Sequence, residues 1–134
     1  MTTYTISDLP AYQYVDGTSD FDTARTQCES INMSLAMPKA QFLLDQLSAQ
    51  VINSPSFHGT VDVWVGLYDF DGFNLRYTWL DGTDLDDDWA PWGSGQPYLA
   101  SQKCGYLQIE QNTPPELHDG KCSKDMAYIC QTGN

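Results

Sequence analysis

Four cysteines, Cys28, Cys104, Cys122 and Cys130, constrain this chain of 134 residues more than any other feature of its sequence. None of them forms a C-x-x-C pair, and the chain has only two histidines, so the pattern does not suit a structural zinc site. An even number of cysteines without metal-binding spacing predicts two disulfides and an oxidising, extracellular location. Four cysteines allow three pairings, and spacing alone does not choose among them. Residues 1–4 lack the charged and apolar regions of a secretory signal, so we take Met1 as the start of a mature or recombinant chain.

Length, composition and charge narrow the classes of partner. A chain of this length predicts one domain over residues 1–134, and an apolar fraction of 41% excludes a disordered protein. Six basic against eighteen acidic residues give a net charge of −12, so the basic patch that nucleic acid requires cannot form. No apolar run approaches the ~20 residues of a membrane-spanning helix, so we expect no membrane insertion. Cations, neutral sugars and basic proteins are the favoured partners.

The spacing of apolar residues in the first third of the chain predicts two helices. A cap at Ser19 or Asp20 begins the first, and Pro38 precedes the second, which ends near residues 53–55. Apolar residues at steps of three and four mark the buried face of each helix. They are Phe21, Ala24, Cys28, Ile31 and Leu35 in the first helix, and Leu43, Leu44, Leu47 and Val51 in the second.

From residue 61 onward the apolar period changes to two, which is typical of strands. Valines that alternate with other residues predict a half-buried strand over 61–67. Further strands are expected over 76–80, 104–110 and 127–131, the last two separated by a polar segment, and the Gly- and Pro-rich residues 81–101 form a long loop. Two helices followed by antiparallel strands define an α+β domain.

Several short motifs follow one another in a set order along the chain. They are Ala24-Arg25-Thr26-Gln27-Cys28, Trp64-Val65-Gly66-Leu67, Trp79-Leu80-Asp81-Gly82, Trp89, Gln96-Pro97, Cys104, Asp119, Cys122 and Tyr128-Ile129-Cys130. Together they resemble the C-type lectin-like domains from about Tyr12 to Gln131, in the short form without an extra N-terminal cysteine pair. The resemblance implies the C-type lectin-like fold, with Cys28 joined to Cys130 and Cys104 joined to Cys122.

The resemblance also implies a site at the end of the long loop, where sugar-binding members of the family hold a calcium ion and the sugar hydroxyls. Their motifs are Glu-Pro-Asn or Gln-Pro-Asp, a further acid, and Trp-Asn-Asp. This chain has Gln96-Pro97-Tyr98, Gln102 and Leu117-His118-Asp119 at those positions. A Cys104–Cys122 disulfide would bring these segments close together. We therefore expect Gln96, Tyr98, Gln102, His118 and Asp119 to line a ligand-binding site.

The donor atoms at these positions suit calcium poorly. Only Asp119 keeps a carboxylate, whereas calcium takes about six to eight oxygen ligands. At the family's auxiliary calcium position, Asp69 aligns with the first acid. The remaining acids of that set align with Phe73, Leu99 and Lys103. We expect no tight calcium at either place, and the one cofactor implied is a weakly held divalent cation, calcium or zinc, near His118 and Asp119. One His and one Asp are few ligands for a metal, so a solvated loop histidine is the favoured role of His118 and metal binding is the alternative.

Aromatic and acidic residues outside those motifs have less specific roles. The tryptophans that fit the apolar core are Trp64, Trp79 and Trp89. Trp92 lies on the loop and is either part of a local cluster or a contact residue that, with Tyr98, offers an aromatic face to a sugar ring or a protein. The acidic run over 81–88 is typical of a solvated loop. The Gln96–Pro97 bond, cis in calcium-binding relatives, is open to either isomer here.

These observations favour a secreted, non-catalytic recognition module that binds carbohydrate or a microbial surface polymer without calcium. The alternative is a protein-binding or structural lectin-like domain without sugar activity. Asp86 and Glu110 could be drawn as a hydrolytic pair, and only His58 and His118 could serve a Ser–His–Asp arrangement. Nothing in the sequence fixes the geometry of either set, so we expect no enzyme activity.

Overall fold

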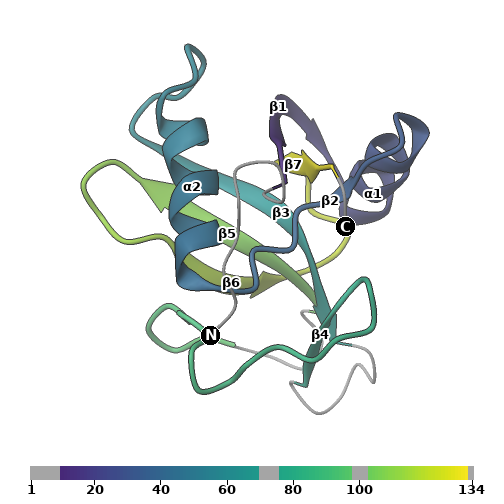
Figure 1. Ribbon diagram of the computed structural model, residues 1–134, viewed down its shortest axis with the longest axis vertical. Coiled ribbons are helices and arrows are strands. Elements are labelled where there is room, and N and C mark those ends of the chain that lie inside the picture. The colour runs from purple at the N-terminus through teal and green to yellow at the C-terminus, as the bar shows by residue number, and fades with distance from the viewer. Residues whose placement is uncertain (1–9, 70–75, 98–102, 133–134) are drawn as a thin grey trace.

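The computed structural model describes residues 10–69, 76–97 and 103–132, which form two helices and one sheet (Figure 1). The predicted α+β class and C-type lectin-like fold are confirmed. The elements are β1 (Tyr12–Ser19), α1 (Phe21–Ser30), β2 (Ser34–Leu35), α2 (Gln41–Ile52), β3 (Thr60–Asp69), β4 (Tyr77–Trp79), β5 (Cys104–Glu110), β6 (Glu116–Gly120) and β7 (Met126–Gln131).

Helix α1 begins where the sequence predicts but ends sooner. The Asp20 carboxylate caps it by accepting a hydrogen bond from the Thr23 N–H at 2.8 Å. Asn32 adopts a φ of +61°, and this left-handed residue ends the helix. The prediction that Ile31 and Leu35 continue the buried helical face was wrong, because Ile31 is 51% exposed and Leu35 reaches the core from strand β2.

Helix α2 confirms the second predicted helix, and it begins three residues after Pro38. Its inward face is apolar and lies against one face of the sheet, while α1 lies at the other side of the fold (Figure 1). Two apolar clusters result, one under each helix. The cluster under α2 includes Leu44, Leu47, Val63, Val65 and Leu67, and that under α1 includes Phe21, Ala24, Cys28, Trp64 and Tyr128.

The strand order β1-β7-β3-β5-β6 makes β3 the centre of the sheet, with β2 paired to β7 and β4 paired to β3. The prediction of a half-buried strand was wrong, because residues 63–67 are buried on both faces, between the two helices. The sheet is also mixed rather than purely antiparallel, since β3 runs parallel to β7. Strands β1, β2 and β6 lie in segments for which the sequence predicted no strand.

Both predicted disulfides are confirmed. Cys28 in α1 is joined to Cys130 in β7, with 5.5 Å between their Cα atoms, and Cys104 in β5 is joined to Cys122, with 5.2 Å. The first ties the helix to the central part of the sheet, and the second fixes the chain on either side of β6. Neither α1 nor α2 combines the length and apolar character needed to cross a membrane.

Candidate ligand-binding site at the long loop

The long loop between β4 and β5 returns to the edge of the sheet and lies against β6. The Gly93 N–H donates to the Leu117 carbonyl at 2.9 Å, and the Leu117 N–H donates to the Pro91 carbonyl at 2.8 Å. Trp92 and Leu117 thereby form a parallel bridge. A Cβ atom on Gly93 would lie 2.7 Å from the Nε2 atom of His118, so the loop can approach β6 this closely only at a glycine.

Gln96 and Asp119 are brought together at this edge. The Gln96 side-chain Oε1 accepts a hydrogen bond from the Asp119 N–H at 3.0 Å, and the Gln96–Pro97 peptide bond is cis. The other two residues expected here, Tyr98 and Gln102, lie outside the described residues. Gln96, which the sequence motif selected, therefore connects the loop to β6 through its side chain.

The Asp119 carboxylate points into the protein. Asp119 is only 3% exposed, and its Oδ2 atom accepts a hydrogen bond from the Tyr77 hydroxyl at 2.9 Å. Tyr77, on β4, is equally buried. Burial raises the pKa of Tyr77, and the hydrogen bond and charge of Asp119 raise it further. Tyr77 therefore stays protonated and serves as a permanent donor to Asp119.

His118 and Asp119 do not form a pair, because neighbouring residues of a strand point to opposite faces. The His118 ring stacks on Tyr106, with 5.4 Å between centroids and an interplanar angle of 18°. Its Nε2 atom lies 3.2 Å from a carboxylate oxygen of Glu116, and its side chain is 15% exposed. The structure thus places the two expected metal ligands apart.

Trp92 belongs to a local aromatic cluster. Its ring contacts Tyr77 edge-on, with 5.1 Å between centroids, and it packs against the apolar cluster under α2 while remaining half-buried. Of the two roles considered for this residue, packing is the one that the contacts show.

The acidic part of the loop is folded back onto the domain. Asp81 forms an ion pair with Lys39 and accepts hydrogen bonds from the N–H and hydroxyl of Thr83. Partial burial raises the pKa of Asp81, but these bonds outweigh it and bring the pKa to about 2. The Trp89 Nε1–H donates to the Gln41 side chain at 3.0 Å. This bond holds the loop at Trp89 against the first residue of α2.

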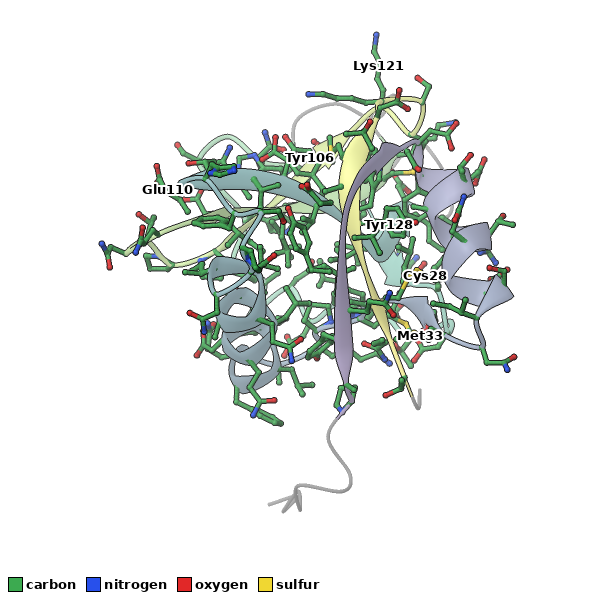
Figure 2. The ribbon with its side chains drawn as sticks, turned by 90° about the horizontal axis from the view of Figure 1, so that it is seen from above. Cys28, Met33, Tyr106, Glu110, Lys121 and Tyr128 are labelled. Carbon is green, nitrogen blue, oxygen red and sulfur yellow. A yellow bond between two sulfur atoms is a disulfide. The ribbon has the colours of Figure 1, made fainter. Side chains whose placement is uncertain are left out.

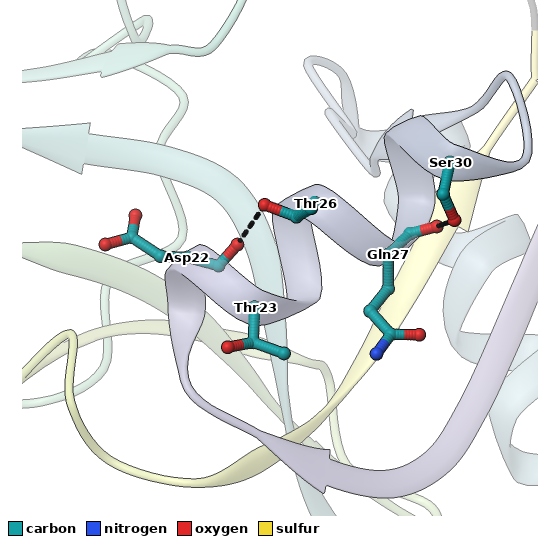
Figure 3. Close-up of a pocket in the computed structure, with 5 residues that line it drawn as sticks. All are labelled: Asp22, Thr23, Thr26, Gln27 and Ser30. Atoms are coloured by element: carbon teal, nitrogen blue, oxygen red, sulfur yellow. Dashed lines mark hydrogen bonds between the residues drawn. The ribbon is translucent and has the colours of Figure 1, made fainter.

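A separate hollow of about 440 Å³ lies along α1 (Figure 3). Its walls include Thr26 and Ser30, whose hydroxyls donate to the carbonyls of Asp22 and Gln27 within the helix. Because those donors are already used, the hollow presents few groups fixed for a ligand. The long-loop edge is the better-organised candidate site.

An α+β domain with two disulfides and a long loop packed on a sheet edge defines a class of recognition domain, and comparison with known proteins gives its family. The Lectin C-type domain family matches residues 18–132. A C-type lectin domain-containing protein 180 of Caenorhabditis elegans is 30% identical over 127 residues, which cover 90% of this chain but only 14% of that protein. The chain therefore belongs to the C-type lectin domain family.

Solved structures agree with this fold. The mouse scavenger receptor C-type lectin carbohydrate-recognition domain superposes with a TM-score of 0.75 at 20% identity, covering 99% of this chain and 93% of that one. Human lithostathine gives 0.77 at 20% identity, with coverage of 99% and 96%. The C-type lectin domain of murine dendritic cell inhibitory receptor 2, in complex with an N-glycan, gives 0.78 at 17% identity, with coverage of 93% and 91%. At such identities the likeness concerns the fold alone.

The described residues do not fit the calcium ion that many members of this family hold. The Asp119 carboxylate faces Tyr77, and the Gln96 oxygen faces a backbone N–H rather than an open site. In the described ranges no three His, Cys, Asp or Glu side chains gather where a metal could bind. At the auxiliary position, Asp69 is buried and Lys103 carries the wrong charge, while Phe73 and Leu99 lie outside the described residues.

Tyr77 is a residue of this edge that the sequence did not reveal. Tyr77 lies two residues before Trp79 in a short alternating strand, where an aromatic residue is typical of the apolar core. In the sequence it is 42 residues away from Asp119. The signal that could have found it is the isolated acid itself. A buried carboxylate needs a donor, and Tyr77 supplies one from β4, which pairs with β3 and not with β6.

Proposed function

We propose that residues 1–134 form one secreted recognition domain, which binds carbohydrate or a microbial surface polymer at its long-loop edge without calcium. The observation that carries this proposal is the contact network of Tyr77, Asp119 and Gln96, which joins β4, β6 and the loop through protein groups. Membership of a family of generally non-catalytic recognition modules supports it.

The network supports calcium independence because it supplies bonds of the kind an ion would otherwise supply. Hydrogen bonds to a carboxylate are stronger than those between neutral groups, and this one lies in a buried place where water does not compete. The loop is also held by the two backbone bonds to Leu117 and by the edge contact of Trp92 on Tyr77. The edge is thereby ordered before a ligand arrives, which lowers the entropic cost of binding.

The proposal divides the candidate residues into two groups. Asp119 and Tyr77 are positioning residues, because both side chains are buried. Gln96, Trp92 and His118 keep part of their surface open and can contact a ligand. Tyr98 and Gln102 remain contact residues by the resemblance alone. A sugar would find amide and imidazole groups for its hydroxyls and part of an indole ring for its apolar face.

No catalytic step is part of this proposal. Asp86 lies in the loop after β4, Glu110 lies at the end of β5, and His58 is exposed in the connection between α2 and β3. His118 stacks on Tyr106 and pairs with Glu116 rather than with a serine. None of these groups is arranged as the acid and base of a hydrolase.

A glycan and microbial-polymer binding screen, run in parallel with calcium, zinc and EDTA, tests the proposal. We expect binding that EDTA leaves unchanged and that Gln96→Ala lowers about tenfold or more. Gln50→Ala, on the exposed face of α2, is the matched control and leaves binding intact. Binding abolished by EDTA would overturn calcium independence. Absence of glycan binding together with capture of a protein ligand would favour the alternative of a protein-binding domain.

A further inference from the structure

A second pocket lies between α1, the turn that follows it, the turn after β4 and the end of β7. Its volume is about 310 Å³, which is at the lower end of the range for small-molecule sites. We call it the methionine pocket. Met33, Met37 and Leu80 form its apolar part, and Arg25, Glu29 and Asp81 carry its charges.

The floor of the methionine pocket is fixed. Met37 and Gln131 are each only 6% exposed, and the Gln131 side-chain oxygen accepts a hydrogen bond from the Met37 N–H at 2.7 Å. Met37 and Leu80 pack over Gly66, where an added Cβ atom would lie 3.2 Å from each side chain. The apolar surface is therefore held in place by the sheet beneath it.

The backbone of the walls is fixed as well, while the Arg25 and Glu29 side chains that it carries are about half exposed. The disulfide between Cys28 and Cys130 ties α1 to β7. Glu29 and Gln131, which line the pocket, are the residues that directly follow these two cysteines in the chain. The Met33 N–H donates to the Cys28 carbonyl at 2.9 Å, and Figure 2 shows the two residues together beside β7. A pocket built on a covalent bond and a paired strand exists before the ligand arrives, which favours binding of a small molecule.

The charges of the methionine pocket are both positive and negative. The Arg25 Nε–H donates to a carboxylate oxygen of Glu29 at 3.2 Å. Among the described residues, no group accepts a hydrogen bond from the two terminal amino groups of Arg25. Asp81 is held by Lys39 and Thr83 and stays ionised. The pocket thus offers a donor group suited to a carboxylate and two carboxylates suited to an ammonium group.

We infer that the methionine pocket binds a free α-amino acid with an aliphatic side chain. The ligand carboxylate pairs with Arg25, its ammonium group with Glu29 and Asp81, and its side chain lies on Met33, Met37 and Leu80. A zwitterion matches both signs of charge in the lining, and an aliphatic side chain matches its apolar part. None of its residues is among those proposed to contact a ligand at the long-loop edge, so its failure is distinguishable from failure of the proposed function.

Methyl NMR with 13C-labelled methionine tests this inference, and the probe is L-leucine. The chain has four methionines, so Met33 and Met37 report on the pocket while Met126, in the cluster under α1, is an internal control. We expect saturable shifts of the first two methyl signals and none of the third. Leucinamide, N-acetyl-leucine and glycine each lack one feature of the ligand and bind about tenfold more weakly or worse.

Variants separate the assigned roles. Arg25→Gln weakens leucine binding about tenfold and abolishes the preference for leucine over leucinamide, while Arg76→Gln, an exposed arginine outside the pocket, leaves both unchanged. Amide spectra confirm that each variant is folded. The inference is wrong if neither methyl signal shifts saturably up to about 10 mM leucine, or if N-acetyl-leucine binds as tightly as leucine.

Discussion

The α1 side of this domain and its long-loop edge are held together by different physical means, although both disulfides belong to or pack against the apolar cluster under α1. Around Cys28–Cys130, buried apolar side chains of α1, β3 and β7 fill the space between helix and sheet. At the long-loop edge, the loop meets β6 through hydrogen bonds, a buried carboxylate and one edge-on aromatic contact. Apolar burial tolerates small changes in shape, whereas a buried polar network depends on every partner being present. The loop region should therefore be the more sensitive to single-atom changes.

The largest expected effect separates the two disulfides. In the chain-entropy model, replacing Cys28 and Cys130 by alanine costs about 4–5 kcal/mol, because the bond spans 102 residues. Replacing Cys104 and Cys122, which span 18 residues, costs about 3 kcal/mol. Urea unfolding of the two double variants measures both free energies. An equal or reversed order would show that native-state packing, rather than loop length, decides the contribution of each disulfide.

A smaller effect is expected where the loop touches β6. Gly93→Ala would force a Cβ atom against His118 and Glu116, at a cost of about 1–3 kcal/mol. Gly17→Ala in β1 is the matched control, because an added Cβ atom there has no neighbour within 4 Å. Thermal unfolding of the two variants gives the comparison. A Gly93→Ala variant as stable as the control would mean that the loop can move away from β6 without loss.

The network itself is tested by removing one hydroxyl. Tyr77→Phe leaves the buried Asp119 carboxylate without this donor and costs about 1–3 kcal/mol of the free energy of unfolding. Tyr12→Phe is a close control, because the Tyr12 hydroxyl is also buried yet has no hydrogen-bond partner among the described residues. We expect its effect to stay within about 0.5 kcal/mol. Equal losses in both variants would contradict the assigned role of Tyr77.

The smallest effect concerns pH. The folded-state pKa of Asp81, about 2, lies below its ordinary value of 3.8, so ionised Asp81 stabilises the fold above about pH 4, and that contribution disappears as the pH falls toward 2. Because the side chain is largely solvated, the effect stays below about 1 kcal/mol. The free energy of unfolding of the Asp81→Asn variant should change less with pH over this range than that of the unaltered protein. Asp87→Asn, in the same loop, serves as the control, and an equal reduction of the pH dependence there would refute the assignment.

The sequence predicted well those elements whose pattern is local. Strand β5 matches its predicted range, because Leu107 and Ile109 alternate with polar residues and the strand is buried on one face. The disulfide pairing came from the resemblance, since spacing alone left three choices. Strand β6 escaped prediction because its outward residues, Glu116 and His118, are polar, and pairing to β5 and to the loop, rather than its own composition, makes it a strand.

The candidate site was predicted only in part, for a geometric reason. The motifs correctly selected Gln96 and Asp119 as neighbours. The direction of the Asp119 side chain, however, depends on the register of β6 and on Tyr77 of β4, neither of which a linear motif contains. Trp92 poses the same problem, since only the packed structure shows its ring against Tyr77.

The pairing of the first and last strands has a consequence for how this domain can be built into larger proteins. The Thr132 N–H donates to the Ala11 carbonyl at 3.0 Å, and the Ala11 N–H donates back to the Thr132 hydroxyl at 2.9 Å, so polypeptide enters and leaves through adjacent points. A domain whose chain enters and leaves at adjacent points can be inserted into a loop of another protein. The two host segments that flank the insertion would then stay almost as close to each other as they were without it.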